Sequence, residues 1–185
     1  NPWQSGSGYL HIKKQKEVFK FNNLKSRPVL SLNRDFAAPI EIKSNLNLDD
    51  RLHLLKFDSN SFNRYEVAQN LALEVILDLV KCDENGEDLC VPASYLEAFS
   101  YLIRNKTIDD ASKSWFLTIP NFNTIALKLE TVNVSSIIMA LDVLKKTIAL
   151  HFEKDFIQIY EELKSKDSDN FDVSPEQIGR RQLKT

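Results

Sequence analysis

The side chains best suited to metal or acid–base chemistry are sparse in this sequence of 185 residues. Its three histidines, His11, His53 and His151, lie far apart along the chain. No second histidine comes one helical turn after His151, so the zinc-binding pattern His-Glu-x-x-His is absent. We therefore interpret His53 and His151 as histidines beside the apolar faces of helices and not as metal ligands.

Two cysteines and two pairs of adjacent acids complete the candidates. Cys82 and Cys90 flank the turn-like stretch 83–88, and their spacing fits no common zinc knuckle. Asp49-Asp50 and Asp109-Asp110 look like paired carboxylates, but adjacent acids in the first turn of a helix are usually capping groups. The chain also lacks a glycine-rich phosphate loop and a nucleophile elbow. The sequence therefore predicts no catalytic, cofactor-binding or metal-binding residue in this chain.

Composition and charge are those of an ordinary globular chain. The hydrophobic fraction is 43%, the charged fraction is 27% and the net charge is −2, so neither nucleic acid nor a membrane is an expected partner. No apolar run approaches the roughly 20 residues that span a bilayer. Two cysteines without a secretory signal make a reducing compartment the default, and we expect a cytoplasmic location. The chain lacks an initiator Met and begins near Ser5-Gly6-Ser7-Gly8, so we expect residue 1 not to be a natural start.

The N-terminal part of the chain has a β pattern. Residues 1–43 carry eight basic and three acidic side chains. We interpret the excess as lysines that face water along an edge strand, and we prefer this interpretation to the alternative, a contact surface for an acidic partner. Apolar and polar residues alternate, or branched residues cluster, in four places: Tyr9–Ile12, Val18–Phe21, Pro28–Leu32 and Ala38–Ile42. So few short strands are marginal without partners. We therefore expect the end of a sheet domain whose beginning is missing.

From about Leu48 onward the pattern is helical. Asp49-Asp50 lies in the first turn of one expected helix, and Ser59 or Asn60 is expected to cap a second helix with a broad apolar face. Further helices are expected to start at Pro92, at Asp109-Asp110 and over residues 122–130, followed by a long one from Asn133-Val134-Ser135 to about Lys164. Asp167-Ser168-Asp169 is a predicted loop. Ser174-Pro175 is a predicted helix start, and we expect the helix after it to be cut in mid-pattern.

Five passages follow one another along the chain in a recognisable order. They are Arg27–Ile40, Asp58–Gln69, Phe116–Pro120, Ile159-Tyr160 and Ile178–Lys184. Together they resemble the M1-family zinc aminopeptidases of the alanyl aminopeptidase N branch, whose first two passages read RPVxSLxRxFSAPV and D-x-F-x-R-W-x-A-A-Q. Ala37 replaces the usual Ser and Tyr65 replaces the usual Trp. The resemblance runs from about Glu17 to the end, and residues 1–16 match poorly.

The resemblance implies a fold and a parent activity. It implies that residues 1–43 are the remnant of a β-sandwich domain and that residues 44–185 are the first part of a C-terminal α-helical domain. The fold class expected is mainly α: a superhelical domain of helix pairs, preceded by a few antiparallel strands from a truncated sandwich. The family uses one zinc ion to remove N-terminal amino acids from peptides, with ligands in a domain that lies N-terminal to this part.

The resemblance therefore implies a fragment that caps and scaffolds a zinc site held elsewhere. None of the family's zinc-binding or amine-binding motifs occurs in this sequence, so no family site residue can be carried onto it. We expect zinc in the parent enzyme and none bound by this chain alone. The expected partners are peptide substrates, through the parent enzyme, and the rest of the same polypeptide, with self-association of the fragment possible. A free-standing helical-repeat protein-interaction module is the alternative.

Overall fold

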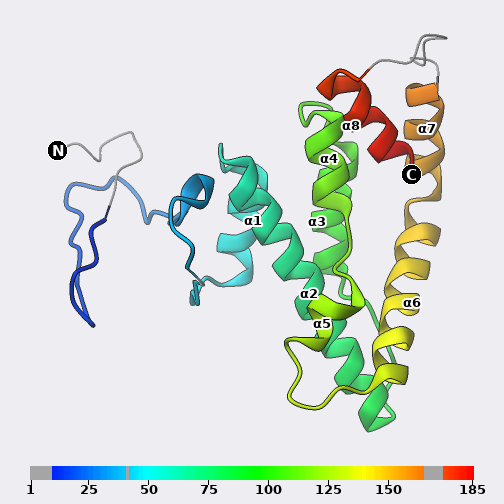
Figure 1. Cartoon of the computed structure of the whole chain (residues 1–185), viewed down its shortest axis with the longest axis horizontal. Coiled ribbons are helices and arrows are strands. Elements are labelled where there is room, and N and C mark those ends of the chain that lie inside the picture. The colour runs from blue at the N-terminus through cyan, green and yellow to red at the C-terminus, as the bar shows by residue number, and fades with distance from the viewer. Residues whose placement is uncertain (1–9, 41, 165–172) are drawn as a thin grey trace. The chain divides into compact units, whose positions relative to one another are not determined.

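The computed structural model describes residues 10–40, 42–164 and 173–185. Within-chain contacts divide the chain into two units, Asn1–Leu30 and Ser31–Thr185. The described part of the first unit, residues 10–30, contains no helix or strand. The second unit carries a short 3₁₀ helix, η1, and the α-helices α1 to α8 (Figure 1). The prediction of a mainly α fold is thereby confirmed.

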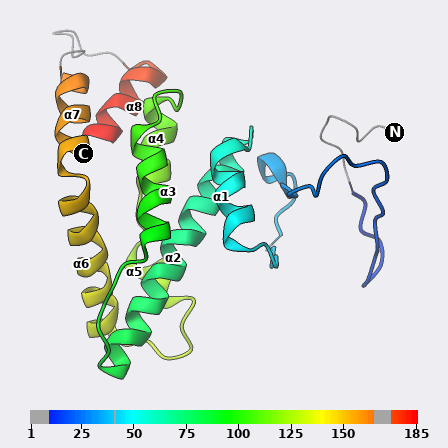
Figure 2. The same ribbon diagram turned by 180° about the vertical axis from the view of Figure 1, so that it is seen from behind.

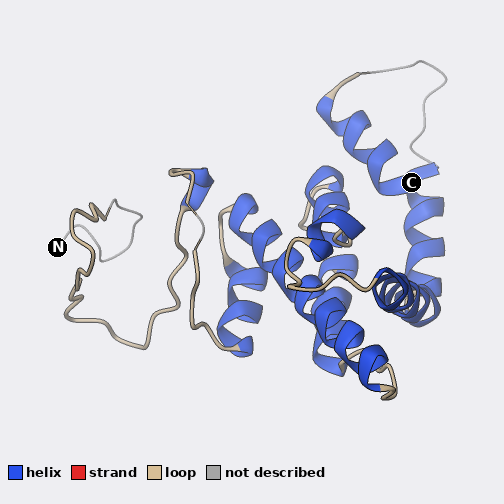
Figure 3. Cartoon of the chain, turned by 60° about the horizontal axis from the view of Figure 1, so that its bottom comes forward, coloured by secondary structure: helices blue, strands red, loops and turns tan. Residues whose placement is uncertain are grey.

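The strands that we expected before this domain are not found. Residues 10–40 and 42–47 form no strand, and their only regular element is η1 (Arg34–Phe36), as Figure 3 shows. A strand is held by hydrogen bonds to a neighbouring strand. A few short strands give each other too few of these bonds to be stable on their own. Tyr9, Glu41 and the predicted loop at Asp167-Ser168-Asp169 lie outside the described residues.

Several helices begin where a side chain accepts a hydrogen bond from a backbone N–H group of the first turn, whereas the helix after Pro92 has no such cap. α1 (Leu48–Phe57), α2 (Ser61–Asn85), α4 (Asp110–Leu117) and α5 (Phe122–Ala126) follow Asn47, Asn60, Asp109 and Asn121, and each of these residues accepts a hydrogen bond from an N–H of the first turn. α6 (Val134–His151) and α8 (Pro175–Lys184) are capped likewise by Asn133 and Ser174. These bonds confirm the predicted starts at Asn60, Asp109, Asn133 and Ser174.

α2 is the element around which the others pack. It contacts α1, α3 (Ala93–Arg104), α4, α5 and α6. Its buried residues lie on several sides of the helix, which explains the broad apolar face seen in the sequence, and they include Leu71, Ala72, Val75, Ile76, Leu79 and Val80. α2 ends at Gly86, whose φ of 69° is the left-handed conformation that glycine adopts most readily. α6 lies along α2, as the views from opposite sides agree (Figure 1, Figure 2).

The prediction of one long helix from Asn133 to about Lys164 is wrong in one respect, because the helix is broken at Phe152. α6 ends at His151 and α7 covers Glu153–Lys164, while Phe152 has φ −113° and ψ 19°. The ring of Phe152 is fully buried, with its centroid 5.1 Å from that of Phe99 on α3. One turn later Asp155 accepts two hydrogen bonds, of 2.8 and 2.9 Å, from Arg104 of α3. Contacts with α3 therefore hold Phe152 at the break and the first turn of α7 after it, whereas the apolar periodicity continues across the break.

α8 packs closely against α4. A Cβ atom added to Gly179 would lie 2.7 Å from the Cβ and 2.8 Å from the backbone N of Ala111. Asp110 and Arg180 form an ion pair across the same crossing, with 3.7 Å between Oδ2 and Nε. The absence of a side chain at Gly179 therefore permits the approach of the two helices.

Gly179→Ala tests this crossing. Helix propensity alone favours alanine over glycine by about 1 kcal/mol. Overpacking against backbone atoms that cannot move aside costs about 1–3 kcal/mol, so we expect a net loss of stability. Urea unfolding should show a lower midpoint than wild type, and amides of α8 should exchange faster. Ile178→Ala, at an exposed neighbouring position of the same helix, is the control. A midpoint raised by Gly179→Ala would contradict the close packing.

The Arg104–Asp155 pair predicts a pH dependence. Hydrogen bonds and charge from Arg104 lower the pKa of Asp155 below its ordinary value of 3.8. A carboxylate with a lowered pKa stabilises the fold above its unfolded-state pKa, and this contribution is lost as the pH falls through the folded-state value. Asp155→Asn should therefore destabilise the chain at pH 7, and the gap from wild type should narrow below about pH 4. Urea titrations at pH 7, 5, 4 and 3 measure the gap. A gap that stays constant across this range would mean that the pair contributes nothing.

Candidate functional site

The carboxylate of Asp58 lies between α1 and α2 and accepts three hydrogen bonds. The side chain is 1% exposed and accepts a hydrogen bond from Ser31 Oγ. Arg34 Nη1 donates to Asp58 Oδ1 at 2.7 Å, and the backbone N–H of Asn60 donates to the same oxygen at 2.8 Å. A buried carboxylate is costly without partners, and these donors compensate for the loss of water.

Two asparagines extend this arrangement. Asn60 Oδ1 accepts from the backbone N–H of Asn63 at 3.0 Å and so caps α2. Asn63 Nδ2 donates to Ser31 Oγ at 2.7 Å and to the carbonyl oxygen of Leu32 at 2.8 Å. We call Ser31, Arg34, Asp58, Asn60 and Asn63 the Asp58 cluster. It joins the first resemblance passage, residues 27–40, to the second, residues 58–69.

The backbone of the first passage is folded tightly beside this cluster. The backbone is left-handed at three positions, with φ values of 51° at Asn33, 57° at Asp35 and 52° at Phe36. This conformation costs residues other than glycine about 1–2 kcal/mol each. Asn33 closes the turn by accepting from the N–H of Ala38 and donating to its carbonyl oxygen, both at 2.9 Å. The ring of Phe36 lies 5.5 Å from that of Phe62 on α2. Contacts with α2 therefore hold a conformation that the segment would not adopt alone.

The rest of the second passage is also engaged in packing. Arg64 Nε donates to the carbonyl oxygen of Leu55 at 2.8 Å, and its guanidinium lies 5.1 Å from the ring centroid of Phe116. The rings of Tyr65 and Trp115 meet edge to face at 6.0 Å. Gln69 Nε2 donates to the carbonyl oxygen of Thr118 at 2.6 Å, so the third passage, residues 116–120, also lies against the start of α2.

A shallow, open depression of about 440 Å³ lies elsewhere, between the end of α1 and α3. Its polar groups are largely paired with one another: Lys56 Nζ lies 3.7 Å from Glu97, and Tyr101 donates to the carbonyl oxygen of Lys56 at 2.9 Å. Arg104 at its rim is bound to Asp155. No nucleophile is paired with a base among the residues that line it, which are Lys56, Glu97, Ser100, Tyr101, Arg104 and Asn105.

The shifted pKa values of three side chains have structural causes. Burial lowers the pKa of Lys113, whose Nζ donates to the carbonyl oxygen of Ile103 at 3.1 Å, while Asp110 and Glu162 raise it. Burial, followed by the charge of Glu87, raises the pKa of Cys82, which disfavours the reactive thiolate. Burial also raises the pKa of Tyr95 in the core. These shifts follow from burial and from the charges of neighbouring side chains.

The residues that the sequence singled out for possible chemistry are not brought together. Within the described part of the chain, no three His, Cys, Asp or Glu side chains could hold a metal ion. His53 packs beside Phe57 with 5.0 Å between ring centroids, and His151 packs beside Phe152 at 4.7 Å. Asp109 caps α4: burial acts to raise its pKa, but hydrogen bonds from Ser112 and nearby backbone groups outweigh burial and lower it. Asp109 is thus a capping group, as the sequence indicated, whereas Asp110 lies in the first turn and pairs with Arg180.

Sequence reasoning did not assign a role to Ser31, Arg34, Asp58 or Asn63, although all four lie in the two resemblance passages. The signal available was their polar character. Ser31 and Arg34 lie 24 to 32 positions before Asp58 and Asn63 along the chain, so their meeting is a property of the fold. The cluster holds backbone segments in place, and every donor and acceptor named here is used for that purpose.

The comparisons with known families agree with the two regions of the sequence. Residues 48–185 match the family described as a domain of unknown function, DUF3458_C, ARM repeats. Residues 3–45 match DUF3458, described as a domain of unknown function with an Ig-like fold. Our predicted boundary between residues 43 and 44 stays a prediction. The part of the chain that the structure describes contains no helix long and apolar enough to cross a membrane.

Relatives with known names are aminopeptidases. The chain is 27% identical to aminopeptidase N of Haemophilus influenzae over 96% of its length and 25% identical to that of Escherichia coli over 99%. It covers 20% and 21% of those proteins, so it spans about a fifth of their length. Aminopeptidase N of Caulobacter vibrioides is 28% identical over 89% of the chain.

A solved structure supports the fold. The crystal structure of Legionella pneumophila aminopeptidase A in complex with aspartic acid matches 90% of this chain and 20% of that one, with a TM-score of 0.74 and 22% identity. The likeness shows that the helices are arranged as in part of that enzyme. Because the ARM-repeat model matches residues 48–185 and the aminopeptidase N relatives cover nearly the whole chain, this chain belongs to the DUF3458_C family, as a segment corresponding to part of an aminopeptidase.

Proposed function

We propose that this chain is a non-catalytic part of a zinc metallo-aminopeptidase and that it caps and scaffolds an active site formed elsewhere in the same polypeptide. One observation carries the proposal: the chain resembles aminopeptidase N along nearly its whole length, yet the passages that bear the resemblance are used for packing. The substrates proposed for the whole protein are peptides with a free N-terminal amino acid.

The residues that the structure describes do not bring together a donor set that suits zinc. Catalytic zinc sites take three protein ligands from His, Glu, Asp or Cys side chains and leave one position open. The described residues hold no group of three such side chains close enough for that. We therefore derive no step of the reaction through a metal in this chain, and we assign the zinc of the proposed parent enzyme to another part of it.

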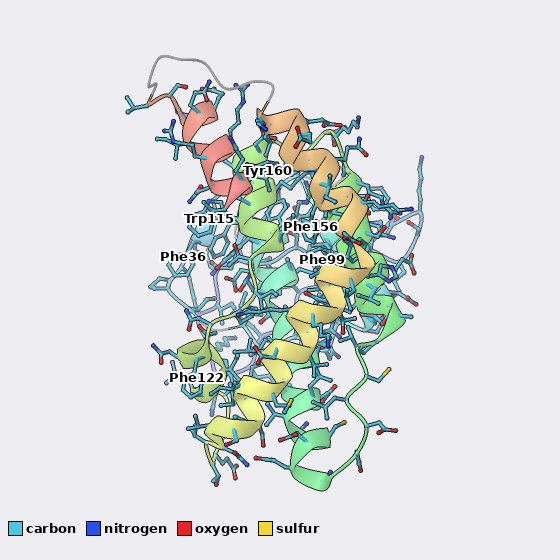
Figure 4. All side chains as sticks on the ribbon, turned by 90° about the vertical axis from the view of Figure 1, so that its right-hand side faces the viewer. Phe36, Phe99, Trp115, Phe122, Phe156 and Tyr160 are labelled. Atoms are coloured by element: carbon cyan, nitrogen blue, oxygen red, sulfur yellow. The ribbon has the colours of Figure 1, made fainter. Side chains whose placement is uncertain are left out.

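An exposed apolar face supports a scaffolding role. Large apolar side chains on α6 and α7 are between 38% and 69% exposed: Ile138, Met139, Leu150, Phe156, Ile157 and Tyr160. Figure 4 shows Phe156 and Tyr160 on α7. Exposed apolar patches of this kind mark surfaces that contact other protein. We propose that this face packs against other parts of the same polypeptide, and self-association of the isolated chain would use the same face.

The alternative is a helical-repeat module that binds other proteins. The description of its family as ARM repeats favours this reading, because such repeats stack into surfaces that bind partners. The two functions differ in what they predict for the whole polypeptide, since only the first predicts peptide hydrolysis by it.

Activity and metal content discriminate between them. The purified full-length polypeptide should release the chromophore from alanyl p-nitroanilide, lose this activity with a zinc chelator, and contain about one zinc per chain. The 185-residue chain alone should show neither activity nor stoichiometric zinc. Chelator-sensitive hydrolysis by the chain alone, or a full-length polypeptide without zinc or activity, would contradict the proposal.

Ile157→Ser tests whether the exposed apolar face of α6 and α7 is covered in the full-length polypeptide. Ile157 is 58% exposed here, so the substitution should change the stability of the 185-residue chain by no more than about 0.5 kcal/mol. In the full-length polypeptide, where we propose that this side chain is covered, the same change should cost about 2–5 kcal/mol. Glu161→Gln, on the exposed side of α7, is the matched control. Thermal unfolding of both lengths measures the difference, and equal small effects in both would rule out packing at this face.

A further inference from the structure

The two ways of dividing this chain disagree over residues 31–45. The Ig-like family model extends to residue 45 and the ARM-repeat model begins at residue 48. The contacts of the structure place the division earlier, between Leu30 and Ser31. The segment from Ser31 to Ile40, which we call the latch segment, therefore belongs to the Ig-like region by sequence and to the helical unit by contact.

The contacts that attach the latch segment are specific and partly buried. Ser31 and Arg34 both donate to the carboxylate of Asp58, and Arg34 Nη2 also donates to Ser59 Oγ at 2.8 Å. From the helical side, Asn63 donates to Ser31 and to the carbonyl oxygen of Leu32.

Further contacts lie at η1. Asn60 Nδ2 donates to Asp35, and the ring of Phe36 packs on that of Phe62. These interactions reach from Ser31 to Phe36, and within this stretch Asn33, Asp35 and Phe36 have left-handed backbone conformations. A segment merely lying on the surface would not be held in this way.

We propose that the Asp58 cluster is a latch that fastens the latch segment to the helical unit, so that this segment is protected together with the helices and comes loose when the latch is broken. The helical unit thus begins about 15 residues upstream of the point where the two family models meet. Asp58 is the central residue of the latch, because its buried carboxylate accepts a hydrogen bond from Ser31 and another from Arg34. The inference concerns the fold and does not depend on the proposed function.

Hydrogen exchange of the 185-residue chain, read by mass spectrometry of peptides, tests the latch. In the wild type, peptides from residues 31–40 should exchange at least about tenfold more slowly than peptides from residues 10–30. Equal rates in the two regions would overturn the proposal, because the segment would then not be fastened to the helical unit.

Three variants separate the latch from general stability. Asp58→Ala and Ser31→Ala each remove hydrogen bonds to the carboxylate and should speed exchange of residues 31–40 by about tenfold or more, while α6 keeps its protection. Ser31→Ala lies on the segment itself, so it decides the question if Asp58→Ala fails to fold. Asp78→Ala is the matched control, because Asp78 is an exposed acid of α2 whose nearest partner is Lys81 at 3.5 Å. Unchanged exchange of residues 31–40 in Ser31→Ala would overturn the proposal.

Trypsin gives an independent reading. Lys25 is exposed, whereas Arg34 is half-buried and bound to Asp58, so the wild type should be cut after Lys25 well before Arg34. In Ser31→Ala, cleavage after Arg34 should become comparable to cleavage after Lys25. Rapid cleavage after Arg34 in the wild type would contradict the latch.

Discussion

The arrangement at the start of the helical unit depends on the hydrogen bonds that the buried carboxylate of Asp58 accepts. A charge removed from water must be matched by donors, and here the donors come from both sides of a junction: Ser31 and Arg34 from the segment before the helices, and the N–H of Asn60 from the start of α2. Removing one partner of such a set leaves another buried group unsatisfied. The cluster therefore specifies one geometry at this junction.

From this point the constraints pass along α2. Its first turns bind Leu55 at the end of α1 through Arg64, and they bind α4 through the contacts of Arg64 with Phe116 and of Tyr65 with Trp115. Its later turns supply the core against which α6 packs. The passages that resemble aminopeptidases thus mark the places where one element fixes the next. The resemblance to these enzymes therefore lies in residues that hold the fold together.

Local signals in the sequence were enough for much of the fold. Helix starts followed from capping residues such as Asn133 and Ser174, whose side chains act within a few positions along the chain. The break at Phe152 did not follow, because its cause is contact with Phe99 and Arg104, about 50 residues away. The strands expected before the helices are not found in residues 10–40 and 42–47 for a related reason, because strand formation depends on partners that a local pattern does not reveal. The Asp58 cluster also depends on distant contacts, and its residues were visible in the sequence only as unexplained polar positions.

A double-mutant cycle between Arg34 and Asp58 tests the central claim most directly. The free energies of unfolding of wild type, Arg34→Gln, Asp58→Asn and the double variant, measured in urea, give the coupling between the two side chains. A buried carboxylate bound to a guanidinium should give a coupling of about 1.5–3 kcal/mol, with the double variant much less destabilised than the sum of the single variants. A coupling within about 0.3 kcal/mol of zero would show that the two side chains act independently, and the junction would then not depend on the carboxylate.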